Sequence, residues 1–199
     1  MIVNLDDISG PQLRSLKLAH VVLRTPDKAV MSQFYVDSLG ATIVHENAIP
    51  SFITYDNEHH RIALAQIPSL KPKDRGICGL ELLFPKHIAF AFDTLEALFL
   101  SYRQRKAKGI LPFWSVNHGM TISLYYHDPD GNVLETQCDT LDNERANEFM
   151  SSKSFQENRI GVDFNLEEIL ERLKKGESFR DLTHRPDIGP RSVETVQMP

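Results

Sequence analysis

Cysteine is scarce in this sequence, and its scarcity limits the kinds of fold that the chain can adopt. Cys78 and Cys138 are the only two among 199 residues. Two thiols are too few for a disulfide framework or for a structural zinc site built from cysteines. Such a low number is typical of proteins kept in a reducing compartment. We therefore exclude a small secreted module that depends on disulfides.

Long apolar runs and an excess of basic residues are also missing. No stretch approaches the roughly 18 apolar residues of a membrane-spanning helix. The first 17 residues are polar and partly acidic and lack the apolar core of a secretory signal. The net charge of −5 does not suggest the basic face of a nucleic-acid-binding protein. We therefore expect a cytoplasmic protein whose partners include neither nucleic acid nor membrane.

Several common functional motifs are absent as well. The chain has no Gly-rich phosphate loop and no G-x-S-x-G nucleophile turn. The segment 128–132 reads DPDGN but lacks the further oxygen ligands of a calcium loop, so it is interpreted as a tight turn. The basic run 103–108 falls late in a predicted helix, where cations are favourable, and is interpreted as a solvated helix end.

What the sequence does contain is a repeated order of strands and helices. In the first half, a predicted strand over 16–24 leads into a helix with Thr25 as N-cap and Pro26 at its first position. Gly40 is a suitable stop for that helix. Three short strand-like stretches follow, and they lie at 41–46, 51–56 and 61–67.

The second half repeats this order. A strand over 85–92 precedes a helix that has Asp93 as its predicted N-cap and Gly109 as its stop. Three further strands are predicted, around 112–116, 121–127 and 132–137. The region 68–85 between the halves is interpreted as a loop with a short helical piece around 80–84. The repeated order predicts an α+β fold made of two βαβββ modules.

These patterns divide the chain into a core and a tail. The predicted core domain covers 1–138, with modules at about 16–67 and 85–138, and the C-terminal extension covers 139–199. A capped amphipathic helix is predicted after Asn165, with its leucines and isoleucine on one face. We expect the extension to pack on the core or on a second subunit.

Three residues are candidates for binding a metal: His20, His87 and Glu135. Each histidine lies on the first strand of a module, and Glu135 lies on the last strand of the second module. Two histidines and one carboxylate on one face of Fe(II) leave positions open for substrate and O2. The alternative for each histidine is a hydrogen-bonded residue of the core.

Other side chains are candidates for proton transfer or substrate contact. They are His60, His118 and Tyr125. The alternative for His60 is a solvated strand end, that for His118 is an exposed loop residue, and that for Tyr125 is ordinary aromatic packing. Phe113 and Trp114 are predicted either to line an apolar pocket or to pack in the core.

Six segments carry a resemblance to a known family: AHVVLRT, FYVDSLG, NEHHRIALA, KHIAFAF, VNHGM and LYYHDPDGNVLE. Together they make the chain, over roughly 16–137, similar to the vicinal oxygen chelate superfamily, and within it to the one-domain type I extradiol ring-cleavage dioxygenases. The resemblance implies paired βαβββ modules whose mixed sheet curls around one metal cleft. It also implies an oxidoreductase that opens a catechol-type ring, including biphenyl-diol-like substrates, with O2.

The resemblance also implies a role for each matching residue. His20, His87 and Glu135 match the metal ligands of the family, which hold Fe(II) or, with the same ligands, Mn(II). The roles of the other matches are acid–base chemistry for His60, contact with bound oxygen or substrate for His118, and a hydrogen bond to a substrate hydroxyl for Tyr125. The resemblance and the amphipathic helix of the C-terminal extension together predict a homodimer.

Two other functions occur within the same fold. A glyoxalase-type isomerase generally uses a fourth ligand late in the first module, where this chain offers Gln66 but no carboxylate. A non-catalytic small-molecule binding protein would lack the three metal ligands. The loop between His60 and His87 is longer than in the biphenyl-type enzymes, and the step from His118 to Tyr125 is about two residues shorter. These departures bear on the substrate and on the role of His118.

Overall fold

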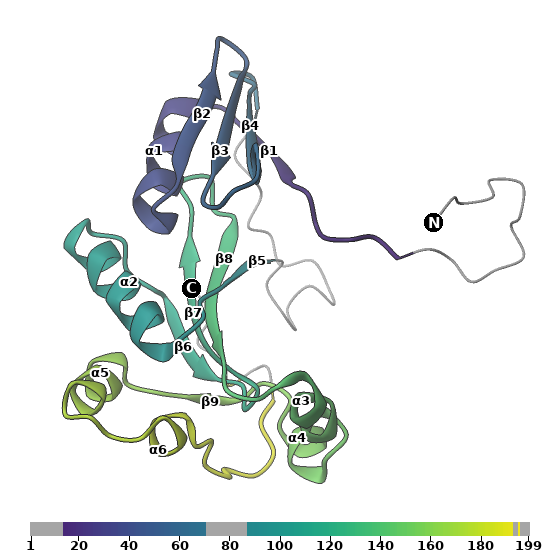
Figure 1. Cartoon of the computed structure of the whole chain (residues 1–199), viewed down its shortest axis with the longest axis vertical. Helices are drawn as coiled ribbons and strands as arrows, with labels where there is room; N and C mark the ends of the chain where they lie inside the picture. The colour runs from purple at the N-terminus through teal and green to yellow at the C-terminus, as the bar shows by residue number, and fades with distance from the viewer. Residues whose placement is uncertain (1–13, 71–86, 193–194, 196–199) are drawn as a thin grey trace, which may run out of the picture.

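The computed structural model describes residues 14–70, 87–192 and 195. The helical piece predicted around 80–84 and Cys78 lie outside these ranges. The described chain alternates strands and helices in the predicted order, twice over, and then continues into the extension (Figure 1). The predictions of an α+β fold and of two βαβββ modules are therefore confirmed.

The first module forms a four-stranded sheet with one helix. Its strand order is β1-β4-β3-β2, with β1 parallel to β4 and the other neighbours antiparallel. The elements are β1 (Val21–Thr25), α1 (Lys28–Leu39), β2 (Thr42–Glu46), β3 (Pro50–Thr54) and β4 (Ile62–Gln66).

The second module repeats this topology and gains one strand. Its sheet has the order β5-β8-β7-β6-β9, and β5 is again parallel to its neighbour β8. The elements of the module are β5 (His87–Ala91), α2 (Leu95–Ala107), β6 (Trp114–Asn117), β7 (Thr121–His127) and β8 (Val133–Asp139). In Figure 1, α1 and α2 lie on the same side of the molecule.

The two helices of the modules begin slightly later than predicted. The N-caps are Asp27 and Thr94, whose side chains accept hydrogen bonds from the backbone N–H groups three residues on. Thr25, the predicted cap of α1, instead accepts from the N–H of Asp27 at 3.1 Å. Both predicted stops are confirmed, because Gly40 and Gly109 adopt the positive φ values of 64° and 77° that end a helix with little strain.

One hydrophobic core joins the two sheets. Met31 and Tyr35 of α1 are fully buried and pack in a cluster with residues of β3 and β4. The same cluster contains Phe90 of β5 and Leu134 of β8. Because one continuous apolar cluster draws on both modules, they are packed together as one body rather than linked as separate units.

The prediction that the basic run 103–108 is a solvated helix end is wrong for Arg105, which is buried. Its side chain is only 1% exposed. It donates to the carbonyl of Ser38 at the end of α1 (3.0 Å), and its other partners are hydroxyl oxygens of α2, β7 and β8. The guanidinium also lies over the ring of Tyr126, at 4.8 Å from the centroid. Arg105 therefore joins the second module to the carbonyl end of a helix in the first, where a cation is favourable.

The extension packs on the second module. It contains α3 (Asn143–Met150), α4 (Lys153–Glu157), β9 (Val162–Asp163), α5 (Leu166–Lys174) and α6 (Phe179–Thr183). Strand β9 pairs with β6, and Leu166 and Leu170 of α5 pack against α2. The predicted N-cap Asn165 is confirmed by its bonds to two N–H groups of α5. In Figure 1, α5 and α6 lie away from the α3–α4 pair, at opposite ends of β9. The boundary at 138–139 stays a prediction.

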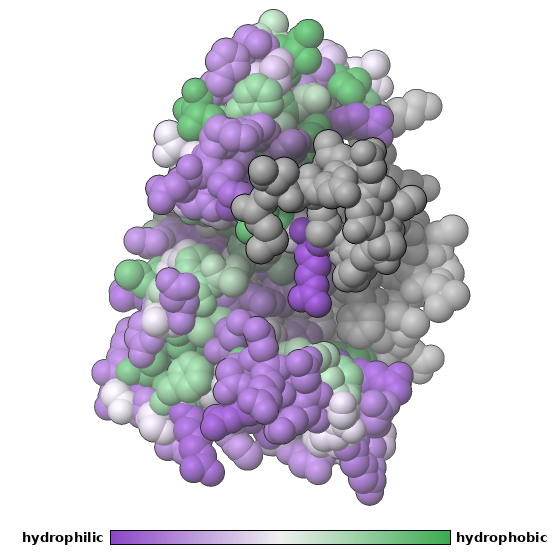
Figure 2. Space-filling view, turned by 45° about the vertical axis from the view of Figure 1, so that its right-hand side comes forward, coloured by the Kyte–Doolittle hydropathy of each residue, from purple (hydrophilic) through white to green (hydrophobic). Residues whose placement is uncertain are grey.

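One face of the molecule can be followed in Figure 2. On the face shown in Figure 2, hydrophilic residues predominate and apolar residues form separate patches. Within the described ranges, no helix has both the length and the apolar character needed to cross a membrane.

Replacing Arg105 tests its role in joining the modules. Arg105→Ala should lower the free energy of unfolding by about 3 kcal/mol, because the Ser38 carbonyl loses its donor and a cavity remains. Urea denaturation followed by circular dichroism would measure this change. Arg103→Ala, on the exposed side of the same helix, should change it by less than about 0.5 kcal/mol. Equal stabilities for the two variants would contradict the assignment.

Candidate active site

The candidate site lies on one face of the second sheet, and the pairing of β8 places its residues. Glu135 of β8 is opposite Ala89 of β5 on one side and opposite Tyr125 of β7 on the other. His87 lies two residues before Ala89 on β5, so it shares a face with Ala89. Register thus brings His87, Tyr125 and Glu135 to the same face of the sheet.

His87 and Glu135 form a close pair. His87 Nε2 lies 2.9 Å from Glu135 Oε2, and the Glu135 side chain is only 6% exposed. Burial by itself would raise the pKa of the Glu135 carboxyl. Hydrogen bonds from His87 and Ser123, together with the nearby His118, outweigh burial and hold this pKa below its usual value. Glu135 is therefore an anion at neutral pH.

The spacing of these two atoms suits a shared metal ion. Metal bonds to imidazole nitrogen and carboxylate oxygen are about 2.1 Å long. Two such ligands at a right angle are then about 3.0 Å apart, close to the spacing observed between His87 and Glu135. Within the described ranges, no three His, Cys, Asp or Glu side chains are gathered closely enough to hold a metal. The structure thus brings together two of the three predicted ligands.

His118 lies beside this pair, in the turn between β6 and β7. Its Nε2 is 3.0 Å from the hydroxyl of Tyr125, and its Nδ1 is 2.5 Å from the carbonyl oxygen of Ile160. A carbonyl oxygen can only accept, so Nδ1 carries the proton of this bond. Burial lowers the pKa of His118 and outweighs the nearby Glu135. In the neutral ring, Nε2 is therefore the acceptor that faces Tyr125.

Tyr125 occupies the centre of the group. Its ring stacks on Trp114 with centroids 4.8 Å apart and meets the ring of His87 edge-on at 5.5 Å. Burial and the negative charge of Glu135 raise the pKa of the Tyr125 hydroxyl. The hydroxyl therefore keeps its proton and acts as a donor. His87, His118, Tyr125 and Glu135 are named the Glu135 cluster below.

Some contributing residues were missed or left open by sequence reasoning. Trp114 is 7% exposed and packs under Tyr125, so core packing rather than a pocket position is its role. Its indole N–H donates to Asp163 at 2.8 Å. Ser123, which bonds Glu135, was not singled out. It lies two residues before Tyr125, and this even spacing on one strand is the signal that could have found it.

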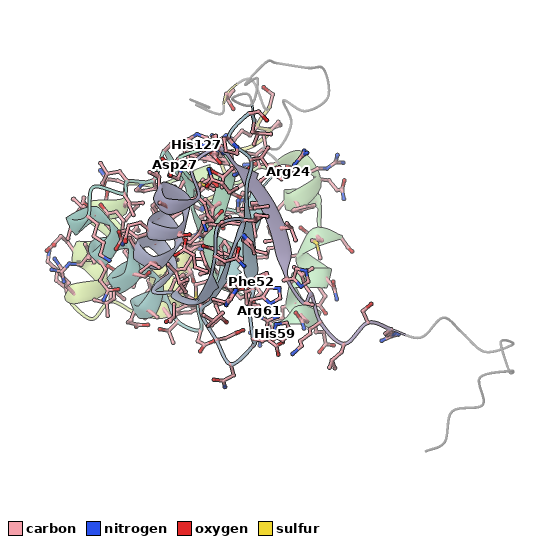
Figure 3. The ribbon with its side chains drawn as sticks, turned by 90° about the horizontal axis from the view of Figure 1, so that it is seen from above. Arg24, Asp27, Phe52, His59, Arg61 and His127 are labelled. Atoms are coloured by element: carbon pink, nitrogen blue, oxygen red, sulfur yellow. The ribbon has the colours of Figure 1, made fainter. Side chains whose placement is uncertain are left out.

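His20 and His60 form a second group, with His59, on the first module. The ring of His60 lies 4.5 Å from the ring of His20 and 4.5 Å from that of His59, between centroids. The ring of Phe52 on β3 packs against His60 at 4.8 Å. Figure 3 shows Phe52, His59 and Arg61 near one another at one end of the first sheet. Partial burial, with the neighbouring histidines, lowers the pKa of His60.

A small cavity connects His20 with the strand that carries His87. It has a volume of about 260 Å³. Its walls include His20 and Tyr55 from the first module and Ile88, Ala89 and Phe90 from β5. The two sheets therefore meet at their edge strands β1 and β5, between His20 and the residues that follow His87.

A larger cavity of about 710 Å³ opens above the Glu135 cluster. Its floor includes Glu135, Tyr125 and His118 from the second module. Helices α3 and α4 of the extension supply the opposite wall. The apolar members of the lining are Met120, Leu141, Ala146, Met150 and Phe155. The cavity thus combines a polar reactive floor with a partly apolar wall, an arrangement typical of small-molecule sites.

Gln66, the residue considered as a fourth ligand, has a structural role. Its side-chain oxygen accepts from the N–H of Lys28 at 2.8 Å, and its amide group bonds the carbonyl of Pro26. These bonds hold the end of β4 against the first turn of α1. With both ends of its amide engaged there, Gln66 does not support a glyoxalase-type site.

Comparison with known proteins gives consistent matches. The family model described as the Glyoxalase/Bleomycin resistance protein/Dioxygenase superfamily matches residues 17–136. The chain is 41% identical over 172 residues to biphenyl-2,3-diol 1,2-dioxygenase 3 of Rhodococcus globerulus, which covers 85% of this chain and 88% of that protein. It is 40% identical over 162 residues to biphenyl-2,3-diol 1,2-dioxygenase 2 of the same organism, covering 80% and 83% of the two chains.

Solved structures share the fold at lower identity. A glyoxalase/dioxygenase from Nostoc punctiforme superposes with a TM-score of 0.50 at 20% identity, over 66% of this chain and 99% of that one. An integron cassette protein from the Halifax Harbour sewage outfall metagenome also gives 0.50 at 20% identity, over 62% and 99%. At this identity the likeness concerns the fold alone.

Substitution of Glu135 tests the metal interpretation of the pair. Glu135→Gln should weaken binding of Fe(II) at least as much as the roughly 10- to 100-fold loss caused by removing an outer-shell partner, because the anionic ligand becomes neutral. Metal content after anaerobic loading and gel filtration would measure this. Glu96→Gln, at an exposed position on α2, should bind as the wild type does. Unchanged metal content in Glu135→Gln would show that the pair is not part of a metal site.

Proposed function

We propose a function from one premise: this chain belongs to the glyoxalase/bleomycin resistance protein/dioxygenase superfamily and, within it, to the extradiol ring-cleavage dioxygenases. The protein binds a catechol-type diol in the 710 Å³ cavity and opens its ring with O2. The observation that carries this proposal is the position of His118, Tyr125 and Glu135 on the floor of that cavity, with His87 paired to Glu135. Both relatives named above act, by their names, on biphenyl-2,3-diol.

The proposed metal ligands are His20, His87 and Glu135. The 2.9 Å spacing of His87 and Glu135 supports two of them. The cavity that His20 shares with β5 supports the third, because it places His20 across from the strand that His87 begins. Bound Fe(II), or Mn(II) held by the same ligands, would supply the electron transfer between diol and O2.

Tyr125 is proposed to hold one hydroxyl of the diol. Its raised pKa keeps the phenol protonated, so it donates a hydrogen bond to the substrate oxygen and stabilises the negative charge on that oxygen. The stacking of Tyr125 on Trp114 fixes the ring, and Tyr125 itself lines the floor of the cavity. Preorganised donors of this kind favour the reactive ionised form of the substrate.

The two remaining histidines are proposed to serve different purposes. His118 is held neutral, with Nε2 toward Tyr125, so without substrate it accepts the single proton of the Tyr125 hydroxyl, and this hydroxyl turns to the diol oxygen when the substrate binds. His60 is proposed as the acid that gives a proton during ring opening. Its position at 4.5 Å from the ring of His20 supports a location beside the reacting atoms.

The cavity wall supports a substrate with an apolar substituent. Met150 and Phe155 from α3 and α4, with Leu141, face the floor that carries Tyr125 and Glu135. A second ring beside the diol would bury its surface on these side chains, while the diol reaches the polar floor. We propose diols of the biphenyl type as substrates.

The proposed reaction balances without an external reductant. One carbon–carbon bond of the ring, next to the diol, breaks, and both atoms of O2 enter the ring-opened product. The electrons that reduce O2 come from the ring itself. The product is a conjugated acid that absorbs visible light.

Oxygen uptake by the Fe(II)-loaded enzyme tests the proposed function. Purified and loaded under anaerobic conditions, the protein should consume O2 with 2,3-dihydroxybiphenyl and catechol and form a yellow product. The Glu135→Ala variant should lose this activity, and the exposed Glu96→Ala variant should keep it. No uptake across a panel of catechols by fully loaded protein would refute extradiol cleavage.

The role of His60 has its own test. His60→Ala should lower kcat by roughly 100- to 10,000-fold, the usual contribution of general acid–base catalysis, while bound iron stays at the wild-type level. Single-turnover kinetics and metal analysis on the same preparations would separate the two effects. Loss of iron together with activity would instead make His60 a ligand. His45→Ala, an exposed histidine on β2, is the matched control.

A further inference from the structure

We infer that the C-terminal extension positions His118 through the carbonyl of Ile160, with Asn158 and Arg185 as the positioning residues. This inference deepens the proposed function, since it concerns a side chain of the same site. It assigns the extension a task within the active site in addition to forming the cavity wall.

The carbonyl that meets His118 belongs to a tightly held turn. Asn158 is 4% exposed, and its side-chain oxygen accepts from the N–H groups of Ile160 (3.1 Å) and Gly161 (2.8 Å). Its side-chain nitrogen donates to the carbonyl of Gly161 at 3.1 Å. Two of these bonds hold the two peptide groups that flank Ile160, and the third holds the peptide group after Gly161. The Ile160 carbonyl therefore has a set direction.

The turn around Ile160 and Gly161 packs closely against the end of β6. Gly161 has a φ of 113°, a conformation that residues with a side chain rarely adopt. A Cβ atom built on Gly161 would lie 2.4 Å from the carbonyl oxygen of Asn117. Only glycine lets the extension approach β6 this closely, and His118 follows Asn117 immediately. The close approach is what brings Ile160 within reach of His118.

Arg185 clamps the same arrangement from a later part of the extension. Its guanidinium donates to the backbone carbonyl of His118 at 3.3 Å and to that of Asn158 at 2.6 Å. It also lies over the ring of Phe149, at 5.5 Å from the centroid. One cation thus ties the backbone of His118 to the turn that bonds its ring.

The consequence for His118 is a fixed tautomer. The Ile160 carbonyl requires the proton on Nδ1, which leaves Nε2 free to accept from the Tyr125 hydroxyl. Without that carbonyl, the proton could move to Nε2, and the ring could turn away from Tyr125. Outer partners that set the tautomer of a metal-bound histidine commonly contribute roughly 10- to 100-fold, and we expect an effect of the same order at His118.

A double-mutant cycle tests this inference in the Fe(II)-loaded, full-length enzyme. Asn158→Ala and Arg185→Met should each lower kcat for 2,3-dihydroxybiphenyl by roughly 10- to 100-fold, with KM changed by less than about twofold. In the His118→Ala background, either substitution should change kcat by less than about twofold, because the positioned side chain is gone. Full additivity of the effects would overturn the inference.

The tautomer gives a second readout that does not depend on turnover. Nitrogen-15 NMR of histidine-labelled, full-length, metal-free protein should show His118 protonated at Nδ1 in the wild type. It should show a shift toward the Nε2-protonated form in Asn158→Ala and Arg185→Met. A wild-type His118 protonated at Nε2, or an unchanged tautomer in both variants, would refute the positioning role.

A control variant and the combination of the two readouts separate a positioning role of the extension from a purely stabilising one. Leu170→Ala removes a buried side chain of α5 that packs against α2, so it should weaken the fold without changing kcat or the His118 tautomer. An equal loss of kcat in Leu170→Ala would show that the extension only stabilises the protein, and would overturn the inference. If His118 is protonated at Nδ1 in the wild type and shifts in the variants as expected, but the enzyme takes up no oxygen with any catechol, the proposed function is refuted and the positioning of His118 by the extension is still supported.

Discussion

The pairing of β8 with both of its neighbours is the constraint on which the site depends. Glu135 lies opposite Ala89 on one side and Tyr125 on the other, so a single register positions the carboxylate against β5 and β7 together. A shift of one residue would turn Glu135 to the helical side of the sheet, because alternate residues face opposite sides. The same shift would separate it from His87. The register is stabilised on that helical side by Leu134, which is buried in the shared core.

The joint between the modules is a second constraint. The proposed ligands come from both modules, so the separation of the edge strands β1 and β5 controls how His20 approaches His87 and Glu135. The shared apolar cluster supplies most of this packing, and it has no directional preference. Arg105 adds direction, since its guanidinium must meet the Ser38 carbonyl and the hydroxyl of Tyr126 at the same time. Apolar contacts alone would hold the two modules together without fixing their relative orientation. The hydrogen bonds of the buried Arg105 guanidinium to oxygen atoms of both modules fix that orientation.

The extension completes what the two modules begin. The second sheet alone would leave the Glu135 cluster facing solvent on one side. Helices α3 and α4 supply the opposite wall of the cavity, while β9 and the turn before it attach to the end of β6. Gly161 makes this attachment possible, because a Cβ there would collide with the backbone of Asn117. A Cβ on Gly119 would collide with the ring of Phe149 in α3.

The sequence by itself determined the elements of the fold and the identity of the candidate residues. Periodicity and turn residues predicted both βαβββ modules, the helix stops at Gly40 and Gly109 and the cap at Asn165, because these depend on neighbouring residues. The N-caps were misplaced by one or two positions, since Asp and Thr are adjacent or nearly so at both starts and compete for the same role.

Tertiary structure decided which of those residues meet. The ten-residue step from Tyr125 to Glu135 crosses a turn, and only the register of the hairpin makes the two side chains cross-strand partners. The bond of His118 to Ile160 spans 42 positions and that of Arg105 to Ser38 spans 67, so no local pattern encodes them. The sequence specifies which groups are available. Their distances depend on strand register and on polar contacts between residues far apart in the chain, because burial of apolar surface alone is not directional.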